Sequence, residues 1–87
     1  MKTENGFEYE ISKSALDDAE LLDDLIEMDE GNIKPAKRVA AGLIGAEGQK
    51  RLYDFCRDEK TGRVSLKDVY TELTYIITHL EGAEKNS

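Results

Sequence analysis

The chain has 87 residues, 36% of them charged and 39% hydrophobic, which suits one small helix-rich domain and leaves no room for a second. Its net charge of −7 argues against general binding of nucleic acid, whose phosphates require a basic surface. No stretch approaches the roughly 20 apolar residues of a transmembrane helix, and the acidic opening MKTENGFEYE lacks the apolar run of a signal peptide. We therefore expect a cytoplasmic protein with no membrane partner.

The first pattern in the chain is FEYEI, residues 7–11, which alternates apolar and acidic side chains with a period of two. This alternation predicts a short β-strand with Phe7, Tyr9 and Ile11 on one face. A single strand is not stable alone. We expect it to pair with another extended piece, such as residues 63–65, or with a second chain.

Two helices are predicted next. Asp17, with a glutamate three residues later, resembles the start of a capping box and predicts a helix over residues 17–30. The apolar residues of this helix recur at helical spacing: Leu21, Leu22, Leu25, Ile26 and Met28. Pro35 suits a first helical turn and Gly45 suits a C-cap, which together predict a second helix over residues 35–44.

Two further helices complete the predicted fold. Apolar spacing predicts a third helix over residues 47–57, and Ser65 predicts an N-cap for a fourth over residues 66–81. Residues 82–87 are polar and are predicted to form a flexible tail. The expected fold is mainly all-α: a single domain over residues 1–87, with about four helices preceded by one short strand.

The segment RDEKTGRVSLKD resembles a calcium-binding EF-hand loop, which requires oxygen ligands at positions 1, 3, 5 and 12 and a glycine at position 6. With Gly62 at position 6, the cation Arg57 occupies position 1 and the short Asp68 occupies position 12. A helix-loop-helix corner is the better interpretation, in which Gly62 takes a positive φ and Ser65 caps the next helix. We expect no metal site here.

Enzymatic chemistry finds little support. The single cysteine, Cys56, and the single histidine, His79, lie on different predicted helices, and nothing in the sequence orients them as a dyad. GLIGAEG has glycines at helix ends but lacks the lysine of a phosphate-binding loop. We interpret the protein as a non-enzyme without a cofactor, and Cys56 as a small buried hydrophobe.

Charge is unevenly distributed along the chain. Residues 1–31 hold eleven acids and two lysines, whereas residues 32–57 have a net charge of +4. Eight acids lie between Asp17 and Glu30, with no basic residue to relieve their repulsion. This segment is a solvated face, or it is a docking surface for a basic segment of a partner or of the chain's own middle third. Self-association would follow if the acidic and basic patches both face outward.

The order of these features resembles a family, the small tail assembly chaperones encoded by tailed bacteriophages and prophages of Gram-positive bacteria. The resemblance runs from about Phe7 to Ser87. It is carried by the order of four blocks: FEYEI, LDDAELLDDLIEMDEGN, LIGAEGQKRLYDFCRDEKTGRV and the terminal EKNS. Ala19 departs from the pattern, because such proteins often carry a larger residue there.

The resemblance implies a role in the host bacterial cytoplasm and not in the mature virion. Such proteins bind the long, aggregation-prone tape measure protein and help it to recruit the tail-tube protein. Many are also made as a longer form by ribosomal frameshifting. Here Glu84, Lys85 and Asn86 can be encoded by a slippery heptamer, which makes a frameshift at this point a hypothesis.

The residues predicted to bind a partner come from the acidic first helix, from the basic second helix and from exposed aromatic and apolar positions. They are Asp23, Asp24, Glu27, Lys37, Arg38, Tyr53, Tyr70, Tyr75 and Ile77. An alternative function is a DNA-mimicking inhibitor, whose acidic helix would occupy the nucleic-acid site of a host enzyme. The third, a calcium sensor, requires the loop that Arg57 disfavours.

Overall fold

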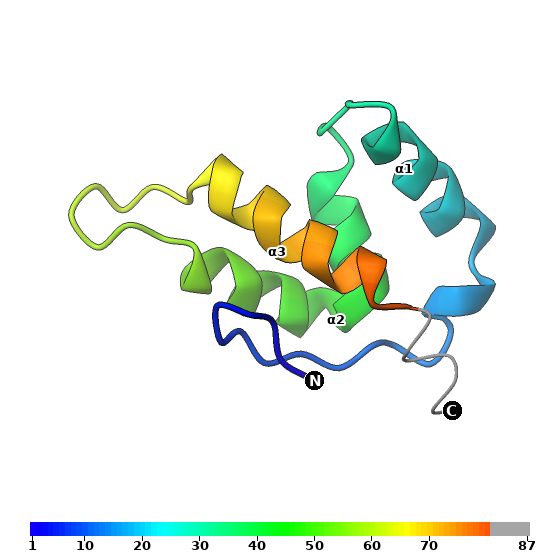
Figure 1. Ribbon diagram of the computed structural model, residues 1–87, viewed down its shortest axis with the longest axis horizontal. Coiled ribbons are helices and arrows are strands. Elements are labelled where there is room, and N and C mark those ends of the chain that lie inside the picture. Colours follow the sequence, from blue (N-terminus) through cyan, green and yellow to red (C-terminus); the bar gives the residue numbers. More distant parts are fainter. Residues whose placement is uncertain (81–87) are drawn as a thin grey trace.

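The computed structural model describes residues 1–80, and they form a mainly helical domain with a radius of gyration of 12.5 Å (Figure 1). A short 3-10 helix, η1 (Ala15–Asp17), leads into α1 (Ala19–Asp29), α2 (Ala36–Phe55) and α3 (Leu66–Thr78). α2 packs against α1, α3 and η1 and is therefore the centre of the fold. The expectation of a mainly helical domain is confirmed.

The predicted strand over residues 7–11 is not present, and residues 1–80 contain two isolated β-bridges but no sheet. Gly6, at φ +95°, turns the chain back on itself, so Tyr9 N–H donates to the Met1 carbonyl and Thr3 N–H to the Phe7 carbonyl. The partner of the extended segment is therefore the first three residues, and not residues 63–65. These two pieces are too short to form a ladder beyond the single bridge between Lys2 and Glu8.

The prediction of four helices is not confirmed either. The segments expected as separate helices over residues 35–44 and 47–57 form the single element α2, with a break at Gly45. Gly45 has φ 81° and ψ 165°, a combination that is essentially restricted to glycine. Beside the break, the Leu43 carbonyl accepts a hydrogen bond of 2.8 Å from Ser12 N–H, which ties the N-terminal segment to α2.

The other predicted boundaries need smaller corrections. The helix expected over residues 17–30 is divided into η1 and α1, and its N-cap is Asp18 and not Asp17, because Asp18 accepts from Leu21 N–H. The helix expected over residues 66–81 ends at Thr78. Its predicted cap is confirmed, since Ser65 Oγ accepts from Asp68 N–H. The predicted tail over residues 82–87, with its frameshift hypothesis, lies outside the described residues.

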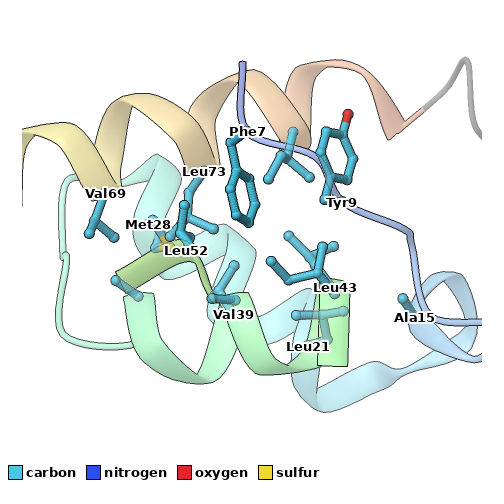
Figure 2. Close-up of a cluster of buried hydrophobic side chains, with 14 of the residues drawn as sticks. Phe7, Tyr9, Ala15, Leu21, Met28, Val39, Leu43, Leu52, Val69 and Leu73 are labelled. Carbon is cyan, nitrogen blue, oxygen red and sulfur yellow. The ribbon is translucent and has the colours of Figure 1, made fainter. Parts of the chain in front are cut away.

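The hydrophobic core lies between α2 and the elements around it. Val39, Leu43 and Leu52 from α2 are fully buried, as are Leu73 and Ile76 from α3. Figure 2 shows the rings of Phe7 and Tyr9 entering this cluster from the N-terminal segment. The alternation of FEYEI therefore did identify the buried side of the segment, although it does not form a strand. Among the described residues, no helix is long and apolar enough to cross a membrane.

Candidate functional site

α1 contacts the rest of the domain along one narrow face. Leu21 and Met28 are buried, and Gly42 of α2 lets Leu21 approach closely. A β-carbon at Gly42 would lie 3.0 Å from Leu21 Cδ1, closer than side chains ordinarily pack. Because so little of its circumference is covered, α1 leaves most of its surface exposed to solvent.

A second apolar surface on α1 faces solvent. Leu22 is 56% exposed and Ile26 is 50% exposed, and they stand one helical turn apart, about 100° and 140° around the helix from Leu21. Leu16 in η1 is 49% exposed. We call Leu16, Leu22 and Ile26 the outer apolar strip. Single exposed leucines need no explanation, whereas exposed apolar side chains grouped on neighbouring elements form a patch, a feature that is common at binding surfaces.

An apolar groove of about 390 Å³ adjoins this strip. It is bounded by η1, the first half of α1, Leu43 of α2 and Leu80 beyond the end of α3. Its floor and walls are mostly leucine side chains, and Asp17 and Asp18 are the two charged residues along it. The arrangement combines an apolar surface with carboxylates at its rim. It can therefore receive apolar side chains that are accompanied by positive charge.

A second groove, of about 490 Å³, lies between α1 and α2 and is lined mainly by charged side chains. Arg38 of α2 forms a bidentate pair there with Asp24, at 3.0 and 3.2 Å. This hydrogen bond and the charge of Asp24 raise the pKa of Arg38 above its ordinary value. Within residues 1–80 this is the one ion pair made by α1, so Glu20 and Asp23 in the same groove have no basic partner there.

A third and smaller hollow, of about 120 Å³, lies between α1 and α3. Tyr70 and Ile77, two of the predicted binding residues, both line this hollow. Leu25 of α1 lines both this hollow and the apolar groove. Tyr70 is 40% exposed and Ile77 is half-buried. Tyr70 and Ile77 therefore lie beside the apolar groove, whereas Asp23 and Asp24 line the charged groove between α1 and α2.

The remaining predicted residues stay outside these hollows. Glu27 accepts a hydrogen bond from the Asn32 amide, and Lys37 is exposed. Tyr53 packs against the core, where burial, and after it the neighbouring Cys56, raises the pKa of its hydroxyl. The Tyr75 ring stacks on His79, with centroids 3.9 Å apart.

Cys56 and His79 do not form a dyad. The Ser65 N–H donates to the Cys56 carbonyl, which places Cys56 at the start of α3, whereas His79 follows its last residue. Thirteen helical residues separate the two ends, about 20 Å. Burial, followed by the nearby charges of Glu72 and Asp68, raises the Cys56 pKa to about 11, so the nucleophilic thiolate is disfavoured.

The loop over residues 57–65, which resembles a calcium-binding loop in sequence, is closed by its own hydrogen bonds. Arg57 Nη1 donates to the Gly62 carbonyl at 2.7 Å, and the Asp58 carboxylate accepts from Lys60 and Thr61 N–H. Gly62 has φ +72°, as the corner interpretation predicts. Within residues 1–80, no three acidic, histidine or cysteine side chains come together as metal ligands would.

Comparison of the chain with protein-family models, with curated proteins and with solved structures finds no match. The candidate site is therefore interpreted from its own residues.

Sequence reasoning missed the most exposed part of this surface. It assigned Leu22 and Ile26 to the same apolar pattern as Leu21 and Met28. A signal was present, because five apolar residues in eight positions exceed what one buried face of a helix requires. Leu16 and Leu80 had no such signal, since their positions depend on how η1 and the end of α3 meet.

Proposed function

We propose that this protein is a phage tail assembly chaperone, which binds the tape measure protein in the host cytoplasm and aids its assembly with the tail-tube protein. In this role it is not an enzyme, needs no cofactor and is absent from the finished virion. A longer frameshifted form belongs to the same proposal.

The observation that carries the proposal is the outer apolar strip beside the apolar groove, on the most acidic helix of the chain. A chaperone for an aggregation-prone helical protein has to cover apolar side chains and yet remain soluble. Exposed leucines surrounded by carboxylates meet both needs, because the apolar atoms bind and the net charge prevents self-aggregation.

The strip also argues against the DNA-mimic alternative. A protein that imitates DNA presents carboxylates where phosphates would lie, and Leu22 and Ile26 interrupt the acids of α1 at half exposure or more. Asp24 is moreover neutralised by Arg38. A surface that alternates leucine with aspartate is suited to bind an amphipathic helix. It is less suited to bind the DNA-binding site of an enzyme, which is built to contact phosphates.

Coexpression with the tape measure protein of the same tail gene cluster tests this function. We expect the wild-type chain to increase the fraction of tape measure protein that stays in the supernatant after centrifugation of the lysate. An unchanged soluble fraction would count against the proposal, as would displacement of DNA from a host enzyme by the purified chain. Expression of the tape measure protein alone is the control.

A further inference from the structure

We propose that the apolar groove and the outer apolar strip together hold one amphipathic α-helix of a partner, whose apolar side is flanked by lysine or arginine. This inference deepens the proposed function, on which the identity of the partner rests. Recognition by a helix lying in a groove uses apolar anchors at i, i+3 or i+4, and i+7. The leucines of η1, α1 and α2 around the groove, with Leu80, offer the matching apolar surface.

The shape of the groove favours side chains over a small molecule. A small-ligand pocket has several polar groups that converge on the ligand, whereas the polar side chains here are the carboxylates of Asp17 and Asp18. Exposed Leu16 and Leu22 line the groove, and exposed Ile26 stands one helical turn beyond Leu22 on α1. A helix can bury anchors in the groove while its neighbouring turn covers the strip.

Charge selects the kind of helix. Asp17 and Asp18 lie on the groove, while Glu20 and Asp23 line the neighbouring charged groove of α1 without a basic partner inside residues 1–80. Lysine or arginine beside the apolar anchors would meet Asp17 and Asp18, whereas glutamate there would be repelled by them and by the negative field of the rest of α1. The charge also steers a basic partner toward the site before contact.

The chain's own terminal segment is a poor occupant. Residues 81–87, EGAEKNS, contain one apolar side chain, an alanine, and two glutamates against one lysine. That composition matches neither the leucine lining nor the acidic rim. A separate basic amphipathic helix fits both.

The test uses two fluorescent synthetic helices of about 18 residues, five turns, with identical leucines at the anchor spacing. One carries lysine at the flanking positions and the other carries glutamate. Fluorescence polarisation with the full chain should show binding of the lysine peptide, and at least about tenfold weaker binding of the glutamate peptide. Added salt should weaken binding of the lysine peptide.

Leu22→Asp tests the position of the helix, with Leu66→Asp as the matched control. Leu22 and Leu66 are 56% and 57% exposed, and Leu66 begins α3, at the opposite end of that helix from Leu80. Both variants add one negative charge, which by itself would favour a basic peptide. We expect L22D to weaken binding about tenfold or more through lost apolar contact, and L66D to change it less than about twofold.

Circular dichroism confirms that each variant is folded, and Leu16→Asp replaces L22D if the latter unfolds. Equal binding of the two peptides, or no effect of L22D and L16D, would overturn the inference. So would a dimer, seen by sedimentation equilibrium, that L22D dissociates, because the strip would then bind a second copy. If the peptide result is negative while the tape measure protein is still solubilised, this inference alone fails. If the lysine peptide binds as expected but the tape measure protein is not solubilised, the proposed function alone fails.

Discussion

Thr3 and Glu72, which are 69 residues apart, share a buried hydrogen bond of 2.6 Å from the threonine hydroxyl to Oε1 of the carboxylate. Asn5 Nδ2 donates to the other carboxylate oxygen at 2.8 Å, and Phe7 N–H donates to the Thr3 hydroxyl oxygen at 3.0 Å. Glu72 is 2% exposed and has no basic partner within residues 1–80. These bonds hold the N-terminal segment on α3.

Replacement of Thr3 by valine should reveal what this bond contributes. The change keeps the shape of the side chain but leaves a buried carboxylate oxygen without its donor, which costs about 1–3 kcal/mol of the free energy of unfolding. Urea denaturation measures the loss. Thr74→Val is the control, because Thr74 is exposed and lies on the same helix as Glu72. This control change should lower the stability much less. Equal effects of the two changes would contradict this role of Thr3.

The N-terminal segment shows what alternation can and cannot predict. The period of two correctly placed Phe7 and Tyr9 on the buried side, because burial depends on the direction of each side chain. It could not predict the hydrogen-bond partner. That partner depends on the turn at Gly6 and on the hydrogen bond from Thr3 to Glu72, a contact between residues that are 69 positions apart.

Gly45→Ala should destabilise the fold through backbone strain. A β-carbon there would meet only Ser12 Oγ at 3.8 Å, an ordinary contact, so space is not the limit. The cost comes from φ +81°, which L-amino acids avoid, and should be about 1–3 kcal/mol. Thermal and urea denaturation measure it. D-Alanine introduced at position 45 by chemical ligation is the control, because it prefers positive φ.

A stability loss with D-alanine as large as with L-alanine would mean that packing, and not φ, limits position 45. The sequence indicated the importance of this glycine, since Gly45 was predicted to end a helix. It also predicted that a helix resumes at residue 47, but not that the two helical segments form one element. Continuation depends on the packing of the second half of α2, where Leu52 is fully buried.

The stability of the protein should fall between pH 9 and pH 11. Burial raises the pKa of Cys56 from 9.0 to about 11, so in this window the folded state binds more protons than the unfolded state. The free energy of unfolding therefore decreases as pH rises, by up to about 2 kcal/mol from this group. Buried Tyr9 and half-buried Tyr53, whose pKa values are also raised, act in the same direction.

Urea denaturation at several pH values, on the wild type and on Cys56→Ala, isolates the cysteine part. The comparison uses the slope against pH, since alanine also changes core packing. We expect a shallower slope for C56A. Identical slopes would show that the thiol has an ordinary pKa. Native alkylation by iodoacetamide at neutral pH should correspondingly be slow, and fast in urea.

The sequence predicted that the acidic helix carries the candidate site, but it did not predict which of its apolar residues are exposed. Charge segregation pointed to α1, and Asp23 and Asp24 do line one of its grooves. Sequence alone could not assign Leu22 to solvent, because a helix with apolar residues around much of its surface can bury any of several faces. Gly42 favours burial of Leu21, because its lack of a side chain lets Leu21 pack closely against α2.

Site-specific photocrosslinking tests the central claim most directly. A photoreactive amino acid is placed at position 22 or at position 66, and the chain is coexpressed with a tape measure protein, the partner that we propose for it. We expect a crosslink to the tape measure protein from position 22, mapped by mass spectrometry to a helical segment rich in leucine and lysine or arginine, and none from position 66. Equal crosslinking from both positions, or none from position 22 while the tape measure protein is solubilised, would contradict this account.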